Sequence, residues 1–366
     1  MIASVLQDLG VPLRFLAPPP STGGLVAKIR DRTHRYLFGN RVVSSLEPAQ
    51  LRRRAAWIEH KLATIEVDVL LSNASRPFAL IKTSLPIVIW RDSTFAGALK
   101  VHRDFRNLAP RSVRLGHQME QAALQQCTVA VFRSHWAADD ACRIYGMNPQ
   151  KVRVIPAGGN IRTAPPRERV AQAIASRSRD CCELLFVGVD WEGKGGPVAL
   201  EICRRLRDDG VAVRLTVVGA ESGRLAAAPS YVRDFGFIDI HTEEGRRRYT
   251  KLLETSHFLL FPSRVDTYGN VLPEANAFGL PALASDNAGI PTIIKNGVNG
   301  QLFPIGGDAE APSYSRFIQA MLSDRTRYEA LALSSYDEYA ARLSWDVVGP
   351  ELVAVLQEAC QPGARR

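Results

Sequence analysis

The chain has 366 residues, of which 46% are hydrophobic and 23% charged, and its formal net charge is +9. This composition is typical of a globular protein and excludes a disordered, collagenous or coiled-coil chain, while the length suits two domains. No apolar run approaches the ~18 residues that a membrane-spanning helix needs. The six cysteines are scattered and form no CxxC pair, which favours reduced thiols over disulfides or a zinc site.

The excess of positive charge lies in the first half of the chain. Residues 1–160 hold 22 Lys and Arg against 11 Asp and Glu, whereas residues 161–366 hold 24 against 26. A basic half indicates an anionic partner, such as an acidic membrane surface, a phosphorylated acceptor or nucleic acid, or else a solvated arginine-rich surface. Because no zinc-finger, RNP or helix-turn-helix signature accompanies the charge, we expect no nucleic-acid partner.

Strand-like and helix-like segments alternate along the chain. The strand-like segments are continuous apolar runs, which favours parallel strands covered on both faces. Repeated β-α-β units predict an α/β protein with two doubly wound domains, whose ligands lie beyond the carboxyl ends of the strands in a cleft between the halves. The predicted strands are 12–17, 67–72, 86–90, 128–133, 152–156, 184–189, 213–219, 232–236, 258–262 and 281–284, and the predicted helices include 51–64, 116–126, 196–209 and 249–255.

A polar segment with two prolines, residues 158–180, interrupts this alternation. We therefore expect one domain over 1–160, a linker over 161–180 and a second domain over 181–344. The remaining residues, 345–366, are predicted to form a helix that packs back on the first domain.

The start of the chain departs from this scheme. An α/β sheet of this kind normally begins with a strand, but the first apolar residues recur at helical spacing and are followed by Gly10. The sequence therefore predicts an initial helix over residues 2–9.

The most informative segment is 261–281, FPSRVDTYGNVLPEANAFGLP. A strand is predicted to end early in this segment and to be followed by a loop with Asp266 and a helix with Glu274. Backbone N–H groups at 269–271 would point out of the helix N-terminus, an arrangement that binds phosphate, and a nearby carboxylate can accept hydrogen bonds from sugar hydroxyls. Structural explanations remain open, with Glu274 as an acid favoured by the helix dipole and Asp266 as a turn residue.

This pattern resembles the paired-acid motif of the retaining glycosyltransferases of family 4, which have the GT-B fold with two Rossmann-like domains. That motif has two glutamates separated by seven residues, with an aromatic residue and a glycine after the first. Here Asp266 takes the first place, Tyr268 and Gly269 follow, and Glu274 takes the second place. The resemblance covers nearly the whole chain and extends to the segments 155–160, 279–281, 289–291 and 296–300.

The resemblance implies a hexosyltransferase that uses a nucleotide-sugar and needs no metal or other cofactor. Glu274 is expected to bind the ribose hydroxyls, and Asp266 to hold hydroxyls of the transferred sugar. The segment 235–238 is similar to the loop that meets the nucleotide base through backbone groups, although it also fits a plain strand end. The implied donor-binding residues are Gly188, Phe237, Ile238, Tyr268, Gly269, Asn270 and Val271.

A second candidate site covers residues 184–196, LLFVGVDWEGKGG, where a predicted strand leads into a glycine-rich loop that carries Lys194. Gly188 and Lys194 fit the GxxxxGK pattern of nucleotide hydrolases, but Gly195 stands where that pattern needs Ser or Thr to hold Mg²⁺. The resemblance implies instead that Lys194 neutralises the donor diphosphate, with Val189 in place of an arginine of the family motif. An exposed lysine without a role is the alternative.

In the first half, Asp92 and Glu120 are the acceptor-side candidates by the same resemblance. Asp92 follows the strand 86–90, where many family members have a histidine, and it could equally cap a helix. The histidines show no metal-ligand spacing and the chain has no DxD motif, so no metal site is expected.

The resemblance also bears on the start of the chain. Family members open with a strand and a glycine-rich loop that approaches the donor. We interpret 12–17 as the second strand, with the first strand and its loop absent; the alternative takes 14–17 as the first strand and 18–25 as the loop.

The expected acceptor is a saccharide or lipid-linked saccharide of the bacterial envelope. The expected location is the cytoplasm, with peripheral contact to an anionic membrane as a further expectation from the basic first half. Two alternatives stay open, a nucleotide-sugar epimerase of the same fold and a non-catalytic nucleotide-sugar-binding protein. The sequence specifies neither the base, the sugar, the acceptor nor the oligomeric state.

Overall fold

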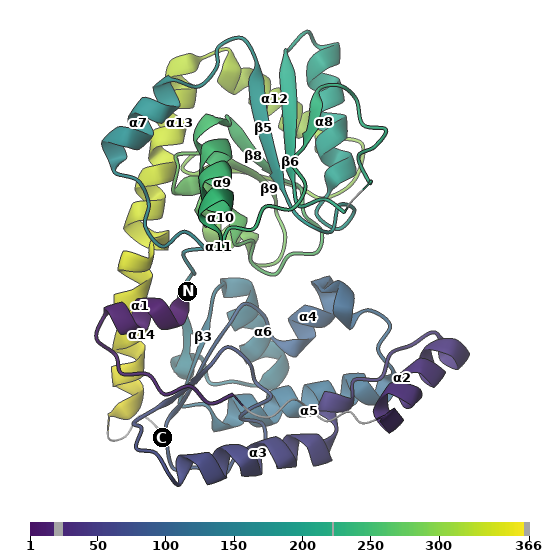
Figure 1. The fold of residues 1–366 in the computed structure, drawn as a ribbon, viewed down its shortest axis with the longest axis vertical. Helices are drawn as coiled ribbons and strands as arrows, with labels where there is room; N and C mark the ends of the chain where they lie inside the picture. The colour runs from purple at the N-terminus through teal and green to yellow at the C-terminus, as the bar shows by residue number, and fades with distance from the viewer. Residues whose placement is uncertain (18–24, 222, 362–366) are drawn as a thin grey trace. The chain divides into compact units, whose positions relative to one another are not determined.

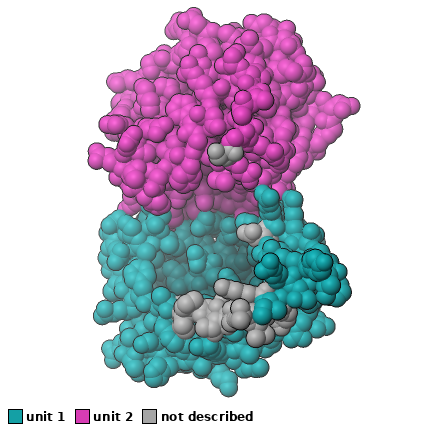
Figure 2. All heavy atoms as spheres, turned by 45° about the vertical axis from the view of Figure 1, so that its right-hand side comes forward, with its two compact units in different colours: residues 1–155, 349–366 teal, residues 156–348 magenta. Residues whose placement is uncertain are grey.

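The computed structural model describes residues 1–17, 25–221 and 223–361, and the chain forms two compact units (Figure 2). Unit 1 comprises residues 1–155 and 349–366, and unit 2 comprises residues 156–348. The last helix, α14 at Trp345–Cys360, begins in unit 2 and continues into unit 1. In the part of the chain that the structure describes, no helix is both long and apolar enough to cross a bilayer.

Unit 1 is built on four parallel strands packed against helices (Figure 1). The strands are β1 Leu70–Ser72, β2 Ile87–Arg91, β3 Val129–Phe132 and β4 Val152–Val154, and the helices are α1 Ile2–Asp8, α2 Leu25–Phe38, α3 Pro48–Leu62, α4 Phe95–Val101, α5 Pro110–Gln126 and α6 His135–Tyr145, with 3-10 helices at Ser44–Leu46, Arg103–Phe105 and Pro149–Lys151. The strands lie in the order β1-β2-β3-β4.

The core of unit 1 follows from the apolar strands. Val88, Ile89 and Val131 are fully buried on neighbouring strands, as expected where helices and loops cover both faces of a parallel sheet. Local signals set the helix ends: Ser134 Oγ accepts a hydrogen bond from the third backbone N–H of α6 at 3.3 Å, and Gly146 ends that helix with φ +64°.

Unit 2 is built on six parallel strands with helices on both faces (Figure 1). The strands are β5 Cys182–Val187, β6 Val213–Val218, β7 Val232–Asp234, β8 Phe258–Phe261, β9 Ala282–Ser285 and β10 Gly300–Phe303, and the helices are α7 Arg167–Ala175, α8 Gly196–Asp208, α9 Glu243–Thr255, α10 Val271–Asn276, α11 Ile290–Ile293, α12 Glu310–Leu322 and α13 Arg325–Glu338, with a π-helical turn at Tyr339–Leu343. The strand order is β10-β9-β8-β5-β6-β7.

Helices α8 and α12 pack together on one face of this sheet, and α9 and α10 lie over the other (Figure 1). This division follows from right-handed crossovers, because the chain moves one way across the sheet through α8 and the other way through α9 and α10. Phe186 and Phe258, which lie on adjacent strands, are fully buried in the resulting core.

The α/β class, the parallel sheets and the initial helix α1 are confirmed. The predicted strand at 12–17 is wrong, because residues 11–17 form no strand and Phe15 is 71% exposed. Pro12 lacks the N–H that a strand ladder needs, and more prolines follow directly after 17. The alternative loop at 18–25 lies almost wholly outside the described residues, and the prediction missed β10.

The segment predicted as a linker contains a packed helix. Helix α7 lies within 161–180, buries Val170 and Ile174, and contacts α13. The polar composition therefore reflects an amphipathic surface helix, and the boundary between the compact units falls earlier, after Ile155.

His257 is buried in unit 2 immediately before β8, with 1% of its surface exposed. Its Nδ1 accepts a hydrogen bond from the backbone N–H of Glu183 at 3.0 Å, and its Nε2 donates to the carbonyl of Ser178 at 2.9 Å. Burial lowers the pKa of His257 from 6.5 to about 4. The unfolded chain therefore takes up this proton at a higher pH than the folded chain, so stability is lost as the pH falls through that window.

We expect this histidine to contribute roughly 3 kcal/mol to the fall in unfolding free energy between pH 6.5 and pH 4. His257→Gln should flatten the pH dependence by about one proton in that window. Urea unfolding of the two proteins at several pH values measures the slope, with the same substitution at exposed His60 as the control. Equal slopes for wild type and His257→Gln would contradict the assignment.

Candidate active site

The strand order of unit 2 reverses between β5 and β8. β6 and β7 follow on one side of this pair, and β9 and β10 follow on the other. In doubly wound sheets, ligands bind at the carboxyl ends of the strands where the order reverses. Lys194 lies in the loop after β5 and Asp266 in the loop after β8, so the topology places both candidates at the expected site.

Tight turns shape the loop that carries Lys194. Asp190 accepts a hydrogen bond from the backbone N–H of Gly193 through Oδ1 at 3.0 Å, and from the N–H of Lys194 through its carbonyl at 2.8 Å. Gly195 has φ +81°, and a Cβ there would lie 2.0 Å from the carbonyl oxygen of Pro262. A side chain is therefore excluded at this position, and the two loops after β5 and β8 are held in direct contact.

Lys194 forms an ion pair with Oδ2 of Asp266. Its Nζ lies 5.6 Å from the centre of the Phe261 ring, and a Cβ on Gly188 would lie only 2.8 Å from its Cγ. The two charged side chains are 23% and 15% exposed, so the pair is partly withdrawn from solvent but reachable. Three predicted residues, Gly188, Lys194 and Asp266, thus meet at one place, and the absence of a side chain on Gly188 gives the lysine its room.

Glu274 is buried at the start of α10, with 2% of its surface exposed. Oε1 accepts hydrogen bonds from the backbone N–H of Asn160 at 2.9 Å and from its side-chain amide at 2.8 Å, while Oε2 accepts from the hydroxyl of Tyr249 at 2.8 Å. Burial raises the pKa of Glu274, and these hydrogen bonds oppose the rise. A carboxylate offers about four acceptor positions, so three donors leave one position for a ligand hydroxyl.

The residues between Asp266 and Glu274 stabilise the local structure. The hydroxyl of Tyr268, which is 2% exposed, accepts from the N–H of Ala157 at 2.7 Å and donates to its carbonyl at 2.8 Å. Gly269 has φ +89°, and a Cβ there would lie 2.9 Å from Leu272. Tyr268 therefore anchors the segment around Ala157 with its hydroxyl. The following Asn270 is the N-cap of α10, and Val271 is its first residue.

The other predicted donor residues lie in the loop between β7 and α9. Phe237 is 76% exposed and Ile238 is 7% exposed, so the first presents its ring to solvent and the second belongs to the core. The N–H of Gly219, after β6, donates to the carbonyl of Gly236 at 2.8 Å and ties this loop to the neighbouring strand end.

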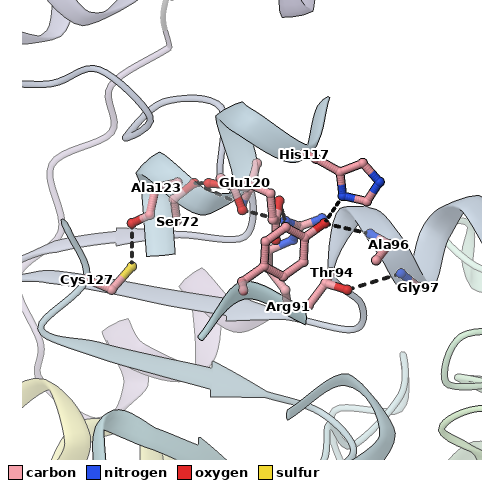
Figure 3. A network of polar contacts seen from close by, with 12 residues as sticks. Ser72, Arg91, Thr94, Ala96, Gly97, His117, Glu120, Ala123 and Cys127 are labelled. Carbon is pink, nitrogen blue, oxygen red and sulfur yellow. Dashed lines mark hydrogen bonds and ion pairs between the residues drawn. The ribbon is translucent and has the colours of Figure 1, made fainter. Parts of the chain in front are cut away.

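The acceptor-side candidate Glu120 is fully buried in unit 1 (Figure 3). Both its carboxylate oxygens accept hydrogen bonds from Nη1 of Arg91, at 2.8 and 2.7 Å, and Arg91 also donates to the hydroxyl of Ser75. The side chain of Arg91 is 16% exposed. Glu120 is therefore placed to orient Arg91 at the carboxyl end of β2.

Asp92 follows Arg91 and is half-buried. The alternative that it caps the next helix is wrong, because the N-cap of α4 is Thr94, whose hydroxyl accepts from the N–H of Gly97 at 3.1 Å (Figure 3). Across residues 1–17, 25–221 and 223–361, no group of three or more His, Cys, Asp or Glu side chains is arranged to hold a metal ion.

Sequence reasoning missed three partners of the candidate residues. Asn160 ends a segment that carries the family resemblance, so it could have been singled out as a polar neighbour. Tyr249 lies on an amphipathic helix and Arg91 at a strand end, and neither position gives a signal for its buried carboxylate partner.

An α/β chain with two parallel sheets, of four and six strands, matches the GT-B structures of glycosyltransferases. Residues 182–324 match the family described as "Glycosyl transferases group 1". The matched residues lie within unit 2, and over them the chain is similar to the group 1 glycosyltransferases, family 4 of the retaining enzymes.

Individual relatives agree with this placement. D-inositol 3-phosphate glycosyltransferase 1 of Catenulispora acidiphila is 29% identical over 259 residues, which are 68% of this chain and 61% of that protein. The matches to this and similarly named relatives cover 46–64% of those proteins, so the chain spans about half to three-fifths of their length.

Solved structures show the same fold. Sucrose-phosphate synthase from Thermosynechococcus elongatus has a TM-score of 0.64 at 16% identity, covering 86% of this chain and 79% of that one. Anabaena HepE in complex with UDP and glucose has a TM-score of 0.61 at 14% identity, covering 97% and 88%.

Proposed function

We propose that this protein transfers a hexose from a nucleotide-sugar to a saccharide or lipid-linked saccharide of the bacterial envelope, with retention of the anomeric configuration. The observation that carries the proposal is the partly buried pair of Lys194 and Asp266 at the strand reversal of unit 2. The proposal draws on the family, since this site alone would also suit a protein that only binds nucleotide-sugars.

Each candidate residue has a role in this proposal. Lys194 binds the diphosphate, whose negative charge grows as the sugar leaves, so its stabilisation is electrostatic. Asp266 exchanges its contact with Lys194 for hydroxyls of the sugar, and the free acceptor position of Glu274 takes a ribose hydroxyl. The backbone at 269–271 contacts phosphate, and the backbone around Phe237 meets the base.

The acceptor is assigned by charge and by likeness. The Catenulispora relative is named for a phosphorylated acceptor, and the excess positive charge of residues 1–160 suits an anionic one. In unit 1, Arg91 and Asp92 at the end of β2 are the groups proposed to meet it.

Melting curves with UDP, GDP and ADP and with their glucose conjugates test the donor assignment. One nucleotide series should raise the melting temperature by binding the folded state, and its sugar conjugate should be hydrolysed slowly when no acceptor is present. UDP is the first choice, because the Anabaena structure holds UDP. Binding without turnover would favour a non-catalytic protein, and a changed sugar still attached to the nucleotide would favour an epimerase.

We expect the activity not to require a divalent metal. The chain has no DxD motif to hold Mg²⁺ or Mn²⁺ on the diphosphate, and Lys194 supplies positive charge instead. The rate of donor hydrolysis should be the same in excess EDTA as in buffer with Mn²⁺. Complete loss in EDTA with recovery on Mn²⁺ would contradict both the expectation and the role given to Lys194.

We further propose a cytoplasmic location with peripheral contact to an anionic membrane through helix α2. This helix exposes Ile29, Tyr36, Leu37 and Phe38, the last three at 89%, 61% and 65%. Basic residues on the same helix would attract acidic headgroups, and the apolar side chains would enter the interface. The wild-type protein should bind phosphatidylglycerol vesicles but not phosphatidylcholine vesicles. The triple variant Tyr36→Ser/Leu37→Ser/Phe38→Ser should lose the binding to phosphatidylglycerol vesicles. Unaltered binding in this variant would contradict the contact.

A further inference from the structure

A second cation lies beside the loop that carries Lys194. Arg264 follows β8, two residues before Asp266, and its backbone N–H donates to the carbonyl of Gly193 at 2.9 Å. The next residue packs equally closely, since a Cβ on Gly193 would lie 2.6 Å from Cγ2 of Val265. The backbone hydrogen bond joins Gly193, the residue before Lys194, to Arg264. The backbone segments that carry the two cations therefore lie next to each other at the strand ends.

The side chain of Arg264 is held by one buried carboxylate. Nη2 donates to Oε2 of Glu310 at 2.6 Å, and the arginine side chain remains 36% exposed. Glu310 is 6% exposed, its Oε2 also accepts from the N–H of Gly306 at 2.9 Å, and its Oε1 is buried with no hydrogen-bond partner among the described residues.

The ion pair between Arg264 and Glu310 is therefore monodentate. A guanidinium has five N–H donors in a fixed fork, and Glu310 engages it through only one of its oxygens. The remaining donors include Nη1, whose contact with the carbonyl of Pro262 is long, at 3.4 Å. Glu310 thus orients Arg264 while leaving most of the guanidinium N–H groups for an anion. A guanidinium group is well suited to bidentate binding of phosphate.

Other cations near these strand ends are less well placed. Arg224, in the loop after β6, pairs with Glu192 at 2.9 Å, but the two side chains are 45% and 59% exposed. Such surface pairs contribute little, and no backbone hydrogen bond joins Arg224 to the Lys194 loop among the described contacts. Val189, directly after Gly188, contributes a 59% exposed apolar side chain and no charge.

We propose that Arg264 is a second phosphate-binding residue, which shares the diphosphate of the donor with Lys194, and that Glu310 is its positioning residue. This inference rests on the proposed function. It extends that function by assigning charge compensation at the leaving group to a residue in the loop after β8. The growing charge of the diphosphate would then be met from both sides of the strand reversal.

Calorimetry with a nucleoside diphosphate and the matching nucleoside tests the assignment, using whichever of UDP, GDP and ADP binds wild type most tightly. Arg264→Ala should weaken diphosphate binding by ~10–100-fold, the effect of losing a charge-assisted hydrogen bond, and leave nucleoside binding unchanged. Arg264→Lys should recover part of the loss. The matched control Arg224→Ala should keep diphosphate affinity within about twofold of wild type.

Arg264→Ala leaves the carboxylate of Glu310 buried without its cation, which can impair folding. The double variant Arg264→Gln/Glu310→Gln removes both charges and should fold while showing the same selective loss. Diphosphate affinity equal to wild type in either folded variant would overturn the inference, as would an equal loss for diphosphate and nucleoside. If wild type binds none of the three diphosphates, the proposed function itself fails, and the inference with it.

Discussion

Lys194→Ala is expected to lower kcat/KM for the nucleotide-sugar by ~10²–10³, because a partly desolvated cation that faces developing charge contributes a few kcal/mol to the transition state. The geometry supports this size of effect. The side chain is 23% exposed, lies across the end of β5 against Gly188, and has Asp266 as its carboxylate partner. A lysine on an open surface would not be packed in this way.

Lys194→Arg should recover only part of the loss, because the broader guanidinium does not fit the space over Gly188 as the ammonium does. Initial rates of donor hydrolysis measure both variants. Lys251→Ala, at an exposed position on α9, is the control for the loss of one positive charge elsewhere. Unchanged kinetics in Lys194→Ala would move the diphosphate site to another part of the molecule.

Glu274→Ala is expected to reduce both stability and nucleotide binding. Three donors, two from Asn160 and one from Tyr249, would lose their acceptor in a buried place, which costs about 2–4 kcal/mol. The loss of the proposed ribose partner should weaken binding of the free nucleoside diphosphate by ~10-fold or more. Urea unfolding and calorimetry measure the two effects separately.

Glu274→Gln is chosen to separate the effect on stability from the effect on nucleotide binding. The amide oxygen can still accept from Asn160 and the amide N–H can donate to the hydroxyl of Tyr249, so stability should stay close to wild type. Nucleotide binding should still weaken, since the charge-assisted hydrogen bond to ribose is lost. Wild-type nucleotide affinity in Glu274→Gln and Glu274→Ala alike would mean that Glu274 serves only the fold.

Asp266→Ala is expected to behave differently from the Glu274 variants. Lys194 keeps its charge and loses its carboxylate partner, so nucleoside diphosphate binding should be no weaker than in wild type. Turnover should fall, because the proposed partner of Asp266 is the transferred sugar. Equal loss of nucleotide binding in Asp266→Ala and Glu274→Ala would show that the two acids cannot be assigned separate roles.

The fold was largely predictable because its signals are local. Buried parallel strands are continuous apolar runs, and the loops after β5 and β8 carry their glycines and charged residues in short segments. Residues 12–17 are the exception. They have the apolar content of a strand, but Pro12 and the prolines that follow lack the backbone N–H groups that strand pairing needs.

The site was less predictable because its contacts join distant parts of the chain. Glu274 is held by Asn160, 114 residues away, and Tyr268 by Ala157, 111 residues away, so no local pattern shows that these side chains are already bonded. The burial of Glu120 could not be predicted from the sequence either. The sequence marks it as a polar residue on a helix, whereas the fold encloses it against Arg91.

The anomeric configuration of the first-formed product tests the central claim most directly. Incubation of the protein with the α-linked glucose conjugate of its preferred nucleotide, followed at once by proton NMR, shows which anomer is released before mutarotation. Retaining transfer predicts that α-glucose, or an α-glucoside when an acceptor is present, appears first and that Lys194→Ala suppresses it. Release of β-glucose, or no turnover by a protein that binds the nucleotide, would contradict the account.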